Sequence, residues 1–155
     1  MNVKEHTVGF DVETTAEPER VRSALLDFSD RRPKLWPGIE PSLYEVYSVG
    51  ETVAEVREGS KAPGGVVWAR ELYDWSDPTT VRWTVQESNF SRPGSYVWAS
   101  IRAGRSGGSL IHVVWNRTGS TLMGRAICRM IRLSRGKPVK ASFKRGLEAI
   151  ENAAT

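Results

Sequence analysis

The sequence contains little cysteine and little histidine: Cys128 is the only thiol, and His6 and His112 are the only imidazoles. A single cysteine excludes an internal disulfide bond and a zinc site made of cysteine thiolates. Two histidines are too few for a histidine-rich metal site. We therefore expect no metal and no cofactor, and a cytoplasmic location, where thiols stay reduced.

Long apolar runs are also missing from the sequence. No stretch is long enough to predict a transmembrane helix, and residues 1–10 lack the apolar core of a signal peptide. Hydrophobic residues make up 39% and charged residues 26% of the 155 residues, which is typical of a globular protein. The length predicts one domain, residues 1–155, with a hydrophobic core.

Acidic residues are absent between Thr118 and Leu147, although the whole chain has 18 of them. Eight of the 22 basic residues lie in this segment, so the rest of the chain has 14 basic against 18 acidic residues. The net charge of +4 therefore comes from one basic segment. Its basic residues are Arg125, Arg129, Arg132, Arg135, Lys137, Lys140, Lys144 and Arg145.

The first part of the chain predicts a strand followed by two short helices. Residues 6–14 alternate apolar and polar side chains, as a half-buried strand does. Pro18 then suits a first helical turn, and Pro37-Gly38 ends a second short helical or turn segment. Between these points four apolar residues have the spacing of one helix face: Val21, Ala24, Leu25 and Phe28.

The middle of the chain alternates between strand patterns and turn sequences. The expected strands are residues 42–49, 52–59, 66–75, 80–88, 95–103 and 109–117. Short turns between them imply antiparallel neighbours. The C-terminal third predicts a helical segment that is interrupted at Gly136-Lys137-Pro138 and then continues with Val139, Phe143, Leu147 and Ile150 on one face.

This order of elements resembles the SRPBCC superfamily, which is also called START-like or the birch-pollen-allergen-like helix-grip fold. Within it, the chain looks most like the bacterial polyketide cyclase/dehydrase group. The resemblance covers nearly the whole chain and rests on the Pro-containing first helix, "LWPGI", "DPTTVRW", "RSGGSLIHVVW" and the terminal "FKRGLEAIENA". None of these is a catalytic motif, so the resemblance implies a fold rather than an activity.

The resemblance implies an α+β helix-grip fold. In this fold a curved antiparallel sheet of about seven strands wraps around a long C-terminal helix, with two short helices after the first strand. An apolar cavity lies between the sheet and the helix. Members of the superfamily bind lipids, polyketides, hormones or aromatic compounds, and some are cyclases or dehydratases. They share no universal catalytic residues, so the catalytic residues here stay unknown.

Four consecutive expected strands each contain one tryptophan: Trp68, Trp83, Trp98 and Trp115. If the last hairpin centres near Ser106, Trp115 lies opposite Val97, and Val97 lies opposite Trp83. This register gathers the apolar residues on one face and is therefore favoured. Trp83 and Trp115 then face the helix, either as core or as a ligand-pocket wall, while Trp98 faces outward near Arg82.

The polar candidates are fewer. Residues 66–75 place either Glu71 or Arg70 toward the cavity, where a charge must be paired or wet. Such a residue is a ligand anchor, a catalytic acid or base, or simply an edge-exposed or salt-bridged residue. His112 is expected on the outer face, and Cys128 is expected to be a small buried apolar residue rather than a nucleophile.

Ten residues form the resulting set of candidate ligand-binding positions. Trp36 either covers the mouth of the cavity or holds the second short helix in place. The set consists of Trp83, Trp115, Val97, Ile101, Val113, Tyr73, Glu71, Arg70, Trp36 and Phe143.

The basic segment allows three interpretations. Arg125, Arg129 and Arg132 share one helix face, which suits an anionic membrane, an acidic ligand or nucleic acid, or plain contact with solvent. No nucleic-acid-binding motif accompanies them, so we expect no nucleic-acid partner.

We expect the chain to bind a hydrophobic or aromatic small molecule, of lipid or polyketide type, as a monomer or homodimer. One alternative is a polyketide cyclase/dehydratase-type enzyme on the same scaffold, so whether any reaction is catalysed stays open. Another is a lipid carrier that docks on anionic membranes through the basic helix 121–135. A cavity carboxylate with a raised pKa beside a Tyr or Arg favours the enzyme.

Overall fold

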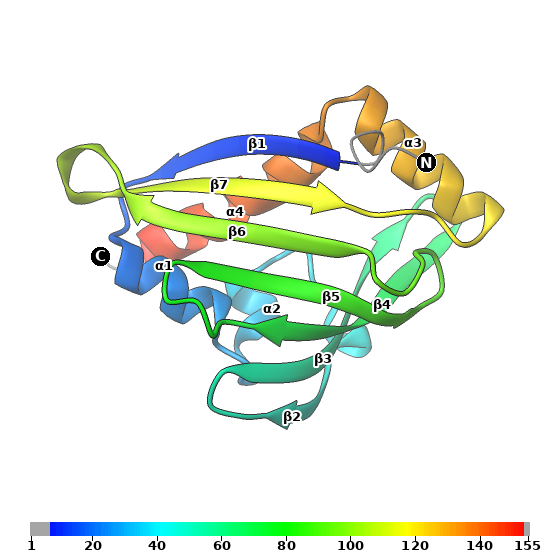
Figure 1. The fold of residues 1–155 in the computed structure, drawn as a ribbon, viewed down its shortest axis with the longest axis horizontal. Helices are drawn as coiled ribbons and strands as arrows, with labels where there is room; N and C mark the ends of the chain where they lie inside the picture. The colour runs from blue at the N-terminus through cyan, green and yellow to red at the C-terminus, as the bar shows by residue number, and fades with distance from the viewer. Residues whose placement is uncertain (1–6, 154–155) are drawn as a thin grey trace.

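The computed structural model describes residues 7–153. Seven antiparallel strands form one curved sheet in the order β1-β7-β6-β5-β4-β3-β2 (Figure 1). The expected α+β helix-grip architecture is confirmed. The strands are β1 (Thr7–Thr14), β2 (Glu45–Val49), β3 (Val53–Ala62), β4 (Gly65–Asp74), β5 (Thr80–Ser88), β6 (Tyr96–Ala103) and β7 (Ser109–Asn116).

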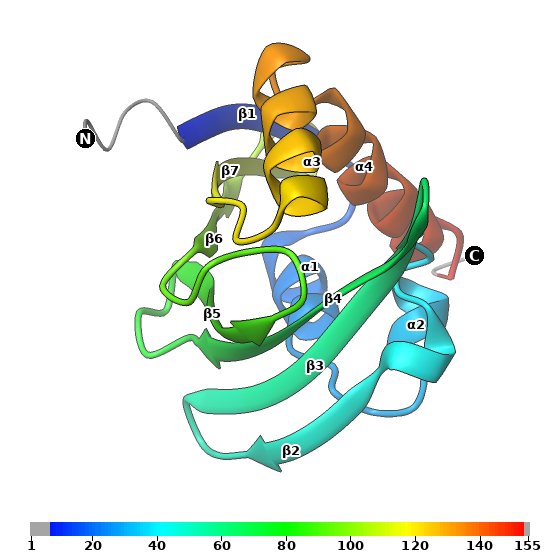
Figure 2. The same cartoon turned by 90° about the vertical axis from the view of Figure 1, so that its right-hand side faces the viewer.

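The helices lie on the inner side of the curved sheet (Figure 2). Two short helices, α1 (Pro18–Leu25) and α2 (Arg32–Leu35), follow β1, and two longer ones, α3 (Leu122–Leu133) and α4 (Lys137–Asn152), end the chain. The strand predicted at residues 42–49 begins later, at Glu45, because a short 3-10 helix, η2 (Pro41–Leu43), occupies its first part. No helix in residues 7–153 combines the length and the apolar character that a membrane span requires.

The register of the central strands is the predicted one. Val97 pairs with Trp115 across β6 and β7, and with Trp83 across β5 and β6. Side chains of successive residues in a strand point to opposite faces, so this register places both tryptophans on the helix side. Trp98 lies on the outer face opposite Arg82. The guanidinium of Arg82 lies over the ring of Tyr96, 4.1 Å from the ring centroid.

The break between α3 and α4 lies at Gly136, as predicted from "GKP". Gly136 has a φ of +78°, a left-handed conformation that favours glycine. A β-carbon at this position would also lie 2.7 Å from Val8 Cγ1. The two helices therefore turn sharply at a point packed against β1, and α4 starts anew with Pro138 in its first turn.

The core lies between the inner face of the sheet and the helices. Its buried members include Val21 of α1, Ile111 of β7 and Leu147 of α4. Val139 and Phe143 of α4 are only partly buried, although they pack against this core. The predicted apolar face of α4 thus contacts the sheet, most tightly in its second half.

Helix α3 differs from a helix that buries its regular apolar positions. Leu122 and Leu133 are 83% and 75% exposed, and Met130 is exposed as well. The residues of α3 that are buried are Gly124, Cys128 and Ile131. Helix α3 therefore presents both apolar and basic side chains to solvent.

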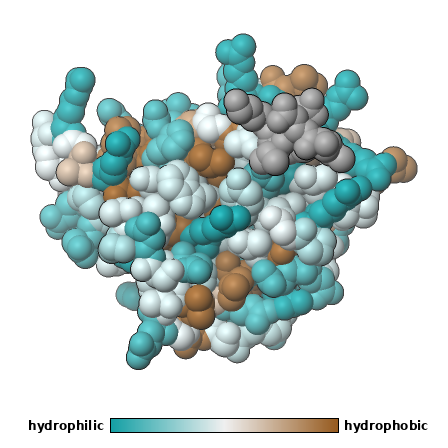
Figure 3. Space-filling view, viewed as in Figure 1, coloured by the Kyte–Doolittle hydropathy of each residue, from teal (hydrophilic) through white to brown (hydrophobic). Residues whose placement is uncertain are grey.

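The outer face of the sheet shows apolar groups scattered among polar ones (Figure 3).

Candidate functional site

A cavity of about 650 Å³ lies between the sheet and the two C-terminal helices. Trp83, Val97 and Trp115 form its wall on the sheet side, and Ile127 and Ile131 of α3 approach from the other side. Exposed residues among its lining mark the mouth, which opens between the β3–β4 hairpin and the α3–α4 turn: Pro37, Lys61, Pro63, Met130, Pro138 and Arg145.

Two smaller compartments lie beside this cavity. One measures about 210 Å³ and the other about 120 Å³. Trp83 and Ser142 line both of them and also the large cavity. The three neighbouring spaces share these two lining residues, and we call them together the branched cavity.

Aromatic rings form the central part of the wall. Trp83 stacks on Tyr73 with 5.3 Å between the ring centroids, and Phe143 lies 6.3 Å from Trp83 on the other side. Trp36 meets Phe143 edge-on at 5.8 Å, and its indole nitrogen donates a hydrogen bond to the carbonyl oxygen of Ala24. Trp36 therefore holds α1 in place and lines the smaller compartments.

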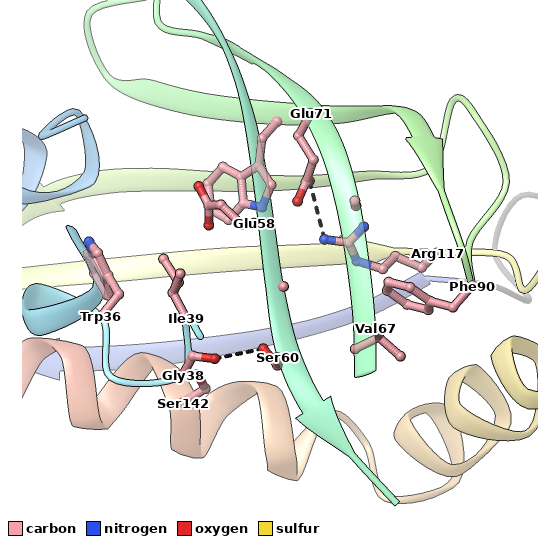
Figure 4. Close-up of a pocket in the computed structure, with 13 residues that line it drawn as sticks. Trp36, Gly38, Ile39, Glu58, Ser60, Val67, Glu71, Phe90, Arg117 and Ser142 are labelled. Carbon is pink, nitrogen blue, oxygen red and sulfur yellow. Dashed lines mark hydrogen bonds and ion pairs between the residues drawn. The ribbon is translucent and has the colours of Figure 1, made fainter. Parts of the chain in front are cut away.

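The first polar feature is an ion pair in the wall of the 210 Å³ compartment. Nη2 of Arg117 donates to Oε2 of Glu71 at 3.3 Å, and both side chains are almost fully buried (Figure 4). Burial raises the pKa of Glu71 to about 7, with Glu58 adding to the rise and Arg117 opposing it. Near neutral pH this carboxyl group can hold or release a proton.

Arg117 has unused hydrogen-bonding capacity. Its Nη1 atom is buried and has no hydrogen-bond partner among the described residues. Arg117 lines both the large cavity and the 210 Å³ compartment, and its Cζ atom lies 5.7 Å from the ring centroid of Phe90. A charged donor left unsatisfied in the interior destabilises the fold unless another group or water reaches it.

The second polar feature is a satisfied network in the 120 Å³ compartment. Oε1 of Glu58 accepts from Nε of Arg32 at 3.0 Å and from the hydroxyl of Tyr73 at 2.7 Å. Arg32 also donates to the Tyr73 oxygen and to the carbonyl oxygen of Leu25. Burial raises the pKa of Tyr73 well above its usual value, and Glu58 raises it further. This network fixes α2 against the sheet.

Seven of the ten candidate residues line the branched cavity. Trp83, Trp115, Val97 and Phe143 border the large cavity, while Trp36, Tyr73 and Glu71 border the smaller compartments.

The other three lie elsewhere. Ile101 and Val113 are inward-facing core residues outside the lining. Arg70 lies on the outer face, where it pairs with Glu55 and Glu87. Of the two faces of β4, the one with Glu71 points inward, so Arg70 does not line the cavity.

Three inward-facing charged residues were missed by sequence reasoning: Arg32, Glu58 and Arg117. Glu58 continues the inward alternation of Ala54 and Val56 along β3, so strand periodicity contained a signal for it. Arg117 is the last residue of the strand expected at residues 109–117 and continues the inward alternation of Val113 and Trp115, so strand periodicity contained a signal for it as well. Arg32 belongs to a four-residue helix that has too few positions to define a face.

Two other predicted placements are as expected. Cys128 is a free, fully buried thiol whose pKa is raised by burial. His112 lies on the outer face, and its Nδ1 is 2.7 Å from Asp11 Oδ1 of the neighbouring strand. Among the described residues no three histidine, cysteine or acidic side chains converge in a way that would hold a metal ion.

Solved structures share this architecture at low sequence identity. The protein TTHA0849 from Thermus thermophilus matches with a TM-score of 0.77 and 18% identity, covering 96% of this chain and 99% of its own. The Zhui aromatase/cyclase from Streptomyces sp. R1128 matches with a TM-score of 0.78 and 12% identity, covering 96% and 95%.

A START superfamily protein from Mycobacterium smegmatis also matches, with a TM-score of 0.62 and 16% identity, over 96% of this chain and 94% of its own. No protein-family model and no curated protein matches the sequence. These likenesses show that the chain has the START-like, polyketide-cyclase-like fold, and they leave its activity to be argued from the site.

Proposed function

We propose that the chain binds a small molecule with an apolar, ring-containing body in the cavity between the sheet and α4. The observation that carries this proposal is the cavity of about 650 Å³, whose wall combines Trp83, Trp115 and Phe143 with aliphatic side chains. Cavities of this size and composition suit small organic ligands. A scaffold of the same fold is used by an aromatase/cyclase, which fits a ligand built of rings.

Titration with N-phenyl-1-naphthylamine, a neutral two-ring dye that fluoresces in apolar surroundings, tests this proposal directly. We expect saturable binding of one dye per chain, together with quenching of tryptophan emission. Native mass spectrometry of protein purified from its own host complements the titration, since a retained ligand adds mass that disappears on denaturation. Dye emission that rises without saturation, with no retained mass, would rule out the proposed pocket.

The second candidate is a cyclase/dehydratase-type enzyme, and Glu71 is the observation that favours it. A carboxyl group with a pKa near 7 can protonate a carbonyl or hydroxyl oxygen and later take the proton back. The cavity would fold a reactive carbonyl chain beside this group. A linear poly-β-keto thioester is the substrate to test, with product formation followed by mass spectrometry. The enzyme hypothesis requires acceleration over the spontaneous reaction and its loss in Glu71→Gln.

The third candidate is a carrier for a lipid-type ligand that docks on anionic membranes through α3. Leu122 and Leu133 are largely exposed there, beside the exposed basic residues Arg125 and Arg129. Apolar and basic side chains on one exposed helix suit the surface of an anionic bilayer. Ile127, Met130 and Ile131 of the same helix line the large cavity, so docking would bring the cavity close to the lipid. The compartment that we propose is the cytoplasm.

A further inference from the structure

The branched cavity has an excess of positive charge inside an apolar wall. The lining of the 650 Å³ cavity contains three basic side chains, Lys61, Arg117 and Arg145, and one acidic side chain, Glu40. Glu40 lies 3.9 Å from Lys61, which leaves Arg145 at the mouth and Arg117, whose partner Glu71 lines the 210 Å³ compartment and not the large cavity. An apolar ligand without charge would leave this excess unused.

Arg117 is placed to receive an anion. Its Nη1 is buried without a partner among residues 7–153, while Nη2 makes a rather long hydrogen bond to Glu71. Arg117 lines both the large cavity and the inner compartment, so its side chain lies beside the space that a ligand would occupy, and Figure 4 shows its guanidinium pointing toward Glu71. Guanidinium groups bind carboxylates and similar oxyanions through two parallel hydrogen bonds.

Glu71 is the carboxylate that already occupies part of this site. We infer that the ligand carries an anionic oxygen group, a carboxylate or phenolate on an apolar ring system, and that this group binds Arg117 in place of the ionised Glu71 carboxylate. Two anions cannot share one buried guanidinium without strong repulsion, so Glu71 takes up a proton from solvent when the ligand binds. The inference rests on the proposed small-molecule function and specifies its ligand class.

The surroundings of Glu71 support this exchange. The charged and titratable groups that act on it are Arg117, Glu58 from β3 and Arg32 from α2, with Tyr73 two residues further along β4. Oε1 of Glu58 accepts hydrogen bonds from Arg32 and Tyr73, so Glu58 belongs to the neighbouring network, while Arg117 pairs with Glu71. Because the pKa of Glu71 is raised to about 7, protonation near neutral pH requires little free energy.

Two dyes with the same ring system test the inference. 8-Anilino-1-naphthalenesulfonate carries a sulfonate that stays ionised from pH 6 to pH 9, and N-phenyl-1-naphthylamine is its uncharged counterpart. In the wild type we expect sulfonate-dye affinity to fall by up to about tenfold per pH unit above pH 7 and to level off below it. The affinity for the neutral dye should stay constant. Calorimetry in two buffers of different ionisation enthalpy should show uptake of up to one proton per sulfonate dye bound at pH 8.

Three variants assign the effect to the ion pair. Arg117→Gln should weaken binding of the sulfonate dye by about tenfold or more relative to binding of the neutral dye, which is the strength of a hydrogen bond to a charged group. Glu71→Gln should remove the pH dependence and the proton uptake. Arg70→Gln removes the same charge from the outer face, at the position next to Glu71 in the sequence. It should change the affinity for neither dye.

The outcomes separate the two levels of the proposal. If the neutral dye does not bind, the proposed small-molecule function fails. If the neutral dye binds but sulfonate-dye affinity is independent of pH and no proton is taken up, the anion site is wrong while the function stands. The wild-type measurements decide this even if Arg117→Gln does not fold.

Discussion

Oε2 of Glu71 lies 3.3 Å from Nη2 of Arg117, although the two residues are 46 positions apart in the sequence. β4 supplies the carboxylate, and the segment after β7 supplies the guanidinium. Both lie in the interior, where the free energy lost by removing two charges from water can exceed the gain from their attraction. The pair is therefore better explained by a role in the cavity than by a gain in stability.

Glu71 should make the stability of the fold depend on pH. Its pKa is about 7 in the folded protein, against 4.5 as its ordinary value. Between these pH values the folded protein keeps a proton that the unfolded chain releases, so stability falls with rising pH by up to about 1.4 kcal/mol per unit. Glu71→Gln lacks this loss. Its melting temperature relative to wild type should rise by roughly 5–10 °C between pH 4.5 and pH 8.

Glu87→Gln is the matched control, since Glu87 is an exposed carboxylate that pairs with Arg70 on the outer face. Thermal unfolding of all three proteins over this pH range gives the comparison. A Glu71→Gln curve that runs parallel to wild type would show that the carboxyl group titrates normally.

The second half of α4 should contribute more to the stability of the fold than the first half. Leu147 is 2% exposed in the core, and Leu147→Ala should reduce the free energy of unfolding by about 2–5 kcal/mol. Phe143 borders open space, so Phe143→Ala should have a smaller effect than its size suggests. Leu133→Ala, on the exposed face of α3, should change the free energy by less than about 0.5 kcal/mol.

Urea denaturation measures these three values. The order expected is Leu147→Ala, then Phe143→Ala, then Leu133→Ala. Equal losses for Leu147→Ala and Leu133→Ala would mean that α4 does not pack against the sheet as described.

Strand periodicity explains why the fold and the aromatic wall could be predicted. Successive residues of a strand point to opposite faces, so one correct hairpin centre placed Trp83, Val97 and Trp115 on the inner side together. The same rule could not choose between Glu71 and Arg70, because both faces of that strand contain a charge among apolar residues. Which of the two charged residues points inward depends on where its ion-pair partner lies. The partner of Glu71 is Arg117, which comes from another part of the chain.

Helix periodicity was less informative for α3. Leu122, Met130 and Leu133 have apolar spacing, yet they are exposed, while Gly124 lies against the backbone of Phe90. A β-carbon at Gly124 would lie 1.9 Å from the Phe90 carbonyl oxygen, so close backbone contact decides which face turns inward. Spacing alone does not reveal such a contact.

The exposed face of α3 should bind anionic lipid if the carrier candidate holds. Arg125→Gln combined with Arg129→Gln should reduce the free energy of binding to phosphatidylserine-containing vesicles by about 2 kcal/mol, since each basic residue near such a surface contributes about 1 kcal/mol. Cosedimentation at low salt measures this binding. Arg132 is left unchanged because it approaches the carbonyl oxygen of Arg117. Melting temperatures should stay near wild type, as both replaced side chains are exposed.

Arg102→Gln with Arg105→Gln provides the control for charge alone, as these residues lie in β6 and the short 3-10 helix η3 (Arg105–Gly107) that follows it. This variant should keep vesicle binding close to wild type. The carrier candidate fails if the wild type itself ignores anionic vesicles at low salt, where screening is weakest.

Trp83 and Trp98 should differ in their effect on ligand binding. Trp83 stacks on Tyr73, faces Phe143 and borders all three parts of the cavity, whereas Trp98 lies on the outer face with His112 at 6.2 Å. Trp83→Phe should weaken the binding of N-phenyl-1-naphthylamine severalfold, because the smaller ring contacts less of the dye. Its stability should fall only modestly, since the space beside the ring is already open.

Trp98→Phe is the matched substitution on the opposite face and should leave the dye affinity unchanged. Fluorescence titration of both variants, with urea denaturation alongside, measures the two effects separately. Equal weakening by the two variants would place the dye outside the cavity and remove the aromatic wall as its binding site.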